Sequence, residues 1–110
     1  MAVLTVEIFA HAPHDADPLS ETQRAGIRAA LRCALAPLCV HTTGSLPLLG
    51  YEVTPYAGAA LIEALCLADS GLDAVDILGA RLEAAMSDAP EVFRDWSLHA
   101  GRTRVEHADS

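Results

Sequence analysis

Two helix-start signatures divide this chain into segments of different periodicity. Ser20 followed by Gln23 forms a capping box, because the serine hydroxyl can accept from the amide of residue 23 while the glutamine side chain returns to the amide of Ser20. Ser70 followed by Asp73 is a second helix start. Apolar residues then recur at helical spacing, which predicts one helix over about residues 20–36, ended by Pro37, and another from 70 to about 87–90.

Several side chains are expected in the core from spacing alone. On the first helix these are Ile27, Leu31, Ala34, Leu35 and Leu38, and on the second they are Leu72, Val75, Leu78, Leu82, Ala85 and Met86. Cys33 and Cys66 have apolar neighbours and are expected to be small core residues as well.

The two ends of the chain have the period of β-strands. Residues 2–10, AVLTVEIFA, alternate so that one face carries Leu4, Val6 and Ile8 and the other carries Val3, Thr5, Glu7 and Phe9. Residues 92–107, VFRDWSLHAGRTRVEH, alternate well enough to form a last strand, with a kink at Gly101 that suits a bulge.

Residues 59–68, AALIEALCLA, allow two interpretations. They are good helix formers, and Thr54 before Pro55 would make a fair helix start. However, a helix that ended directly before Ser70 would need a very tight corner, and a continuous apolar run is typical of a strand buried on both faces. We therefore expect a strand, paired through a turn at residues 57–58 with a preceding strand in LGYEVTPY, residues 49–56.

The resulting order is strand, helix, strand, strand, helix, strand. Two split βαβ units of this length predict an α+β fold, the ferredoxin-like sandwich, in which a four-stranded antiparallel sheet has two helices on one face and the spatial strand order 4-1-3-2. We find no linker, so residues 1–110 are expected to form a single domain.

The overall composition narrows the class of partner. The formal charge of −8 argues against a hold on the phosphate backbone of nucleic acid, which needs clustered positive charge. The three cysteines lack a C-x-x-C spacing, no positively charged leader precedes the first apolar run, and the longest apolar run, interrupted by Glu63, is too short to span a bilayer. We therefore expect an acidic cytoplasmic protein with no membrane span and no cofactor. Its seven basic residues are all arginine, which indicates a GC-rich, bacterial source.

Three stretches resemble a known group of proteins. These are DPLSETQRAGIRAAL, YEVTPYAGAALIEALCLADS and FRDWSLHAGRTRVEH, which together span most of the chain. They resemble small single-domain actinobacterial proteins that have a ferredoxin-like fold and no established activity. The resemblance implies the fold and carries over no site residues.

The segment HAPHDADP, residues 11–18, is the first candidate site. His11, His14, Asp15 and Asp17 offer imidazole and carboxylate ligands, which suit zinc, nickel or copper. The alternative is a polar turn into the first helix, with Asp15 and Asp17 placed favourably near its positive end.

The sheet face turned away from the helices is the second candidate. Glu7 and Glu63 should face outward on neighbouring strands, set among apolar side chains: Val3, Phe9, Leu61, Leu65 and Leu67. An apolar patch of this kind on a soluble protein needs cover, so we expect a homo-oligomer, most simply a dimer, or another protein partner. The sequence thus favours a non-enzymatic interaction or regulatory domain.

The same face supports a second hypothesis, a small enzyme or ligand-binding protein. Two neighbouring carboxylates in a half-buried cleft can share a proton and act in acid–base catalysis, with His99 on the last strand close enough to assist. The simpler interpretation is that Glu7 and Glu63 are solvated or pair with Arg102 or Arg104 across strands.

Overall fold

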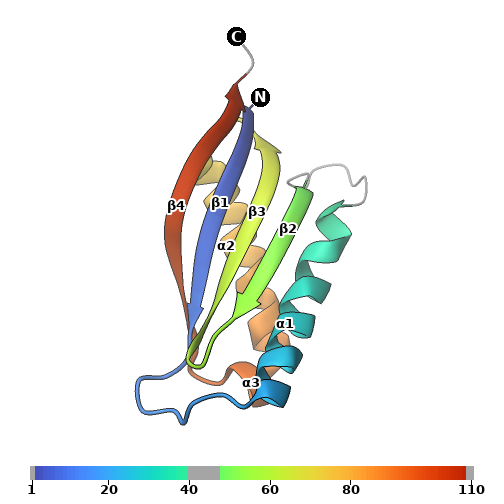
Figure 1. Ribbon diagram of the computed structural model, residues 1–110. Coiled ribbons are helices and arrows are strands. Elements are labelled where there is room, and N and C mark those ends of the chain that lie inside the picture. Colours follow the sequence, from blue (N-terminus) through green and yellow to red (C-terminus); the bar gives the residue numbers. More distant parts are fainter. Residues whose placement is uncertain (1, 40–47, 109–110) are drawn as a thin grey trace.

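A computed structural model describes residues 2–39 and 48–108 of the chain, which build one antiparallel sheet with helices packed against it (Figure 1). The strands are β1 (Ala2–His11), β2 (Leu48–Pro55), β3 (Ala59–Ala68) and β4 (Ser97–Ala108). The helices are α1 (Glu21–Leu35), the 3-10 turn η1 (Ala36–Cys39), α2 (Gly71–Asp88) and the short α3 (Pro90–Phe93).

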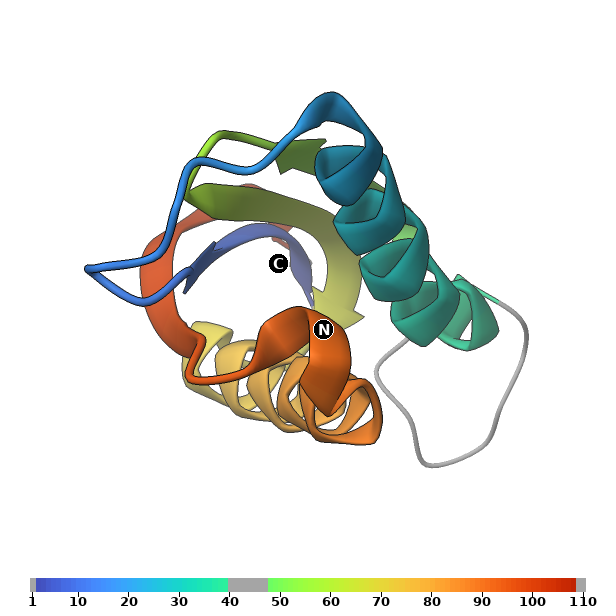
Figure 2. The ribbon, with the colours of Figure 1, turned by 90° about the horizontal axis from the view of Figure 1, so that it is seen from below.

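The four strands lie in the order β2-β3-β1-β4, and every neighbouring pair is antiparallel. Counted from β4, this order is 4-1-3-2. The expectation of an α+β protein with a four-stranded antiparallel sheet is confirmed. Both long helices lie on one side of this sheet, α1 against β2 and α2 against β1, β3 and β4 (Figures 1 and 2).

Residues 59–68 form a strand, and the helical alternative is wrong. β3 pairs along its whole length with β1, from Ala2 opposite Ala68 to His11 opposite Ala59, and on its other side with β2. Hydrogen bonding to two neighbours outweighs the helix propensity of its alanines and leucines. The corner after Ala68 is tight, since α2 begins at Gly71.

The two long helices begin where the sequence predicts. Ser20 caps α1 with the full capping box, and the Ser70 side chain accepts from the amide of Asp73 at the start of α2. Pro37 does end the α-helix, although the chain continues for one 3-10 turn. These starts were predictable because each depends on a hydrogen bond between residues three apart.

Leu72 and Cys33 are exposed, so their predicted burial is wrong. The buried stripe of α2 consists of Ala74, Leu78, Leu82 and Met86, while Leu72 is 79% exposed. Leu72 is two residues from Ala74, which is about 200° around a helix with 3.6 residues per turn. Cys33 is likewise two residues from Leu31, which is fully buried.

The last strand is shorter at its start than predicted. Residues 92 and 93 belong to the short helix α3, which begins at Pro90, a residue suited to a first helical turn. Phe93 is buried and meets Trp96 edge-to-face, with ring centroids 5.4 Å apart. β4 therefore starts at Ser97, after Asp95 has turned the chain with φ of 61°.

The bulge expected at Gly101 is present. Val6 lies opposite Thr103 and Ile8 opposite Ala100, so residues 101 and 102 together face Glu7. A Cβ on Gly101 would stand 2.9 Å from Phe9 Cε2 and 3.0 Å from Glu7 Cβ. The absence of a side chain here lets β4 approach β1 closely at this level.

Candidate functional site

The sheet face without helices carries a row of three carboxylates. Glu63 on β3 lies directly opposite Glu7 on β1 and directly opposite Glu52 on β2. Directly opposed residues of antiparallel strands point to the same face, with Cβ atoms about 5 Å apart. Glu7 and Glu63 are thus neighbours on this open face, and Glu52 extends the pair to a row.

Arg102 ends this row on the fourth strand. Its backbone amide donates to Glu7 Oε1 at 3.2 Å, a contact made possible by the bulge at Gly101. Within residues 2–39 and 48–108, no hydrogen bond or ion pair reaches the carboxylate of Glu63 or Glu52. The row Glu52–Glu63–Glu7–Arg102 therefore reads acidic, acidic, acidic, basic across the sheet.

Apolar side chains flank the row on the same face. Those on β1 and β3 are Val3, Phe9, Leu61, Leu65 and Leu67, and each is half-buried. The residues between them in sequence point the other way and form the core under the helices. A hollow of about 260 Å³ is lined by Thr5, Gly50, Glu52, Glu63 and Leu65 among others. The apolar side chains of the open face are therefore partly covered by neighbouring side chains of the same face, and no helix lies over them.

His99 does not join the two carboxylates. It pairs with Phe9 in the sheet, and its Nε2 lies 3.1 Å from Ser97 Oγ. Its ring meets that of His11 at 5.1 Å between centroids. In the described part of the chain, no hydrogen bond or ion pair links His99 to Glu7 or Glu63. The two carboxylates of the acid–base hypothesis are therefore neighbours, but its histidine contacts Ser97 and His11 and neither carboxylate.

The loop after β1 has the contacts of a turn. Ala12 donates to the carbonyl of Gly58 at 2.9 Å and Leu19 to that of Ala57 at 2.8 Å, which ties the loop to the β2–β3 turn. Asp15 and Asp17 are exposed.

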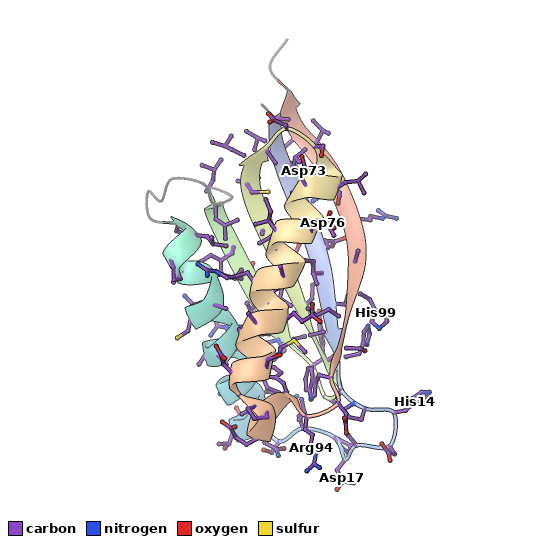
Figure 3. All side chains as sticks on the ribbon, turned by 180° about the vertical axis from the view of Figure 1, so that it is seen from behind. His14, Asp17, Asp73, Asp76, Arg94 and His99 are labelled. Carbon is purple, nitrogen blue, oxygen red and sulfur yellow. The ribbon has the colours of Figure 1, made fainter. Side chains whose placement is uncertain are left out.

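The predicted metal ligands of this loop do not gather. His14 and Asp17 point in different directions (Figure 3). No three histidine, cysteine or carboxylate side chains of residues 2–39 and 48–108 stand close enough together to hold a metal ion. The set His11, His14, Asp15 and Asp17 therefore has no support from the geometry.

A pocket at the loop end of the sheet is lined by residues that are distant from one another in the sequence. It has a volume of about 550 Å³ and is lined by His11, His14, Asp95, Ser97 and His99, with Ala12 and Pro13. A second groove, of about 450 Å³, lies between α2 and β4 and is lined by Asp76, Glu83 and His99 among others. Figure 3 labels Asp76 on α2 and His99 on β4. The meeting of His11 and His99 follows from the pairing of β1 with β4, for which no local motif exists.

Cys66 is the one buried cysteine of the three. Its Sγ lies 3.7 Å from the carbonyl oxygen of Leu4, and burial raises the pKa of the thiol above its usual value of 9.0. Cys33 and Cys39 are exposed free thiols. A raised pKa lowers the thiolate fraction, so Cys66 is a packing residue and a poor nucleophile.

Comparison with known proteins gives no relative: no protein-family model, curated protein or solved structure matches the chain. None of the helices in the described segments is long and apolar enough to cross a membrane.

Proposed function

We propose that this protein is a non-enzymatic interaction domain that works as a homodimer, with the open sheet faces of two copies packed together. The row Glu52–Glu63–Glu7–Arg102 is the observation that carries the proposal. It crosses an uncovered, partly apolar face and has its acidic end on one edge strand and its basic end on the other.

Symmetry makes this row complementary to itself. When two sheets face each other about a two-fold axis parallel to the strands, β4 of one copy lies over β2 of the other. Arg102 then stands over Glu52 of the second copy, and the reverse contact forms at the other edge, because a two-fold interface repeats every contact. Two cross-copy ion pairs therefore fix which edges meet.

The apolar flanks supply the attraction. Leu61, Leu65 and Phe9 still expose part of their surface, and burying apolar surface is worth about 25 cal/mol per Å². The central carboxylates of Glu7 and Glu63 oppose association, since those of the two copies approach one another. We therefore expect a reversible dimer whose population depends on protein concentration.

A charge swap tests this arrangement. Sedimentation velocity of the untagged chain at two concentrations should show a dimer at the higher one. Glu52→Arg and Arg102→Glu should each give folded monomers, and the double variant should dimerise again because the pairs are restored with opposite sign. Arg81→Glu, an exposed change on α2, is the control and should leave the mass unchanged.

Two outcomes would reject the proposal. One is a wild-type protein that stays monomeric over the whole concentration range. The other is a folded double variant that stays monomeric although the wild type dimerises.

We also infer that the scaffold is a ferredoxin-like sandwich and that the protein is cytoplasmic. The strand order and the two helices on one face support the first inference. The free thiols of Cys33, Cys39 and Cys66 suit a reducing compartment. A crystal structure of the untagged protein tests the fold, and cell fractionation of the source organism tests the location.

A further inference from the structure

We propose that His11 and His99 bind one zinc ion at the loop end of the sheet. This site is distinct from the carboxylate row, and the proposal holds whether or not the protein dimerises. His11 is the last residue of β1 and lies opposite Ser97, while His99 on β4 lies opposite Phe9. The two histidines are therefore diagonal neighbours on the same face of adjacent strands.

The spacing of the two rings matches a tetrahedral ion. Their centroids are 5.1 Å apart and their planes are inclined by 68°. With Zn–N bonds of about 2.0–2.1 Å, two imidazoles on one tetrahedral ion have ring centres about 5 Å apart, whereas a right-angled arrangement brings them to about 4.5 Å. The edge-to-face arrangement of the two rings thus has a centroid separation compatible with one tetrahedral ion between them.

Neighbouring side chains set the orientation of the rings. Ser97 Oγ lies 3.1 Å from His99 Nε2, so an Nε2–H that donates to this hydroxyl leaves the lone pair of Nδ1 for a metal. Metal-binding histidines commonly donate their other ring N–H in this way. Phe9 stacks against His11 with centroids 6.0 Å apart. Ser97 and Phe9 are positioning residues for the pair.

The pocket around the pair leaves room for further ligands. The space beside the two rings has a volume of about 550 Å³, and its wall includes His14 and Asp95. Because no third histidine, cysteine or carboxylate of the described residues converges on the pair, a bound ion would take its remaining two ligands from water. The site is therefore an open one, with two protein ligands.

Calorimetric titration of the untagged full chain with zinc chloride tests the site. We expect one zinc ion per chain, and His11→Ala and His99→Ala should each weaken binding at least about tenfold, while His14→Ala changes it less than about threefold. All three side chains are exposed, so the variants should keep the wild-type circular dichroism spectrum.

Three results would overturn the proposal. They are no zinc binding by the wild type, unchanged affinity in His99→Ala, or an equal loss in His14→Ala, which would move the ion into the loop.

Two spectroscopic measurements test the geometry directly. Cobalt(II) in place of zinc should give the strong visible absorption of a tetrahedral site, and the weak absorption of an octahedral ion would contradict the assignment. Ser97→Ala should weaken zinc binding several-fold and shift the ¹⁵N resonances of His99 in the metal-free protein, because the tautomer loses its acceptor. Unchanged resonances would remove Ser97 from the site.

Discussion

At the residue scale, Glu63 has a like charge directly opposite it on each neighbouring strand. It stands between Glu7 and Glu52, and no cation among the described residues pairs with it. Like charges directly opposed across strands destabilise a sheet, by roughly 0.2–1 kcal/mol for each pair. Because the charge of Glu63 lowers the stability of the fold, we look for its role in binding.

Replacing Glu63 by glutamine should therefore stabilise the monomer. We expect the free energy of unfolding of Glu63→Gln to rise by about 0.5–1 kcal/mol, since two unfavourable pairs are lost. Urea unfolding at low salt and low protein concentration measures this. Glu83→Gln, which removes an exposed charge on α2, is the matched control, and an equal gain in both variants would mean that only net charge matters.

Cys66 makes a pH-dependent contribution to stability. Because its pKa is raised in the folded protein, folding favours the protonated thiol. The contribution is complete below the usual value of 9.0 and is lost as the pH rises through the higher pKa of the folded state. The free energy of unfolding should thus fall more steeply above pH 9 in the wild type than in Cys66→Ala. Cys33→Ala, at an exposed thiol, should keep the wild-type slope.

At the element scale, alternation along β3 separates the open face from the core. Leu65 is on the open face, and its neighbour Cys66 is completely buried under the helices. A strand that shifted by one residue would exchange the two faces. A charged side chain introduced at Leu65 or at Cys66 therefore tests the register of β3, since only one of the two positions is buried.

Leu65→Arg should fold and Cys66→Arg should not. The first side chain can extend from the open face, whereas the second would bury an unpaired charge. Circular dichroism and thermal melting of the two variants measure the difference. Equal melting temperatures would contradict the register of β3.

The bulge on β4 depends on Gly101. Gly101→Ala should lower the free energy of unfolding by about 1–3 kcal/mol, because its Cβ would overlap Phe9 and the Cβ of Glu7. Gly50→Ala on β2 is the control, since a Cβ there meets nothing within 4 Å. Urea unfolding measures both variants. Equal losses in the free energy of unfolding would contradict the close approach of β4 to β1 at Gly101.

At the scale of the whole molecule, the row Glu52–Glu63–Glu7–Arg102 affects both the stability of the monomer and the proposed dimerisation. The same carboxylates that repel within one sheet would repel again between two facing sheets. Glu63→Gln should therefore tighten the proposed dimer several-fold, measured as the dissociation constant in sedimentation equilibrium. Glu83→Gln should tighten it much less. Equal effects would indicate that long-range charge, and not the open face, controls association.

The sequence alone determined the parts of this protein that depend on short-range contacts. The caps at Ser20 and Ser70 need only a hydrogen bond between residues three apart, and the two-residue period of 2–10 placed Glu7 and the buried Leu4 on opposite faces. Once the antiparallel sheet was inferred, Glu7 and Glu63 could also be placed on one face.

Tertiary structure decided the rest. His11 met His99 only through the pairing of β1 with β4, two strands distant in sequence, and Arg102 faces Glu7 only because a bulge at Gly101 shifts that pairing. Glu52, in contrast, lies opposite Glu63 across the β2–β3 hairpin, whose turn at residues 57–58 the sequence indicates. The energy of pairing between strands distant in sequence is shared along their whole length, so no local motif reports which of their residues will be opposed. The local sequence pattern therefore determines which face of a strand or helix a residue lies on. The pairing of distant strands determines which residue lies opposite it.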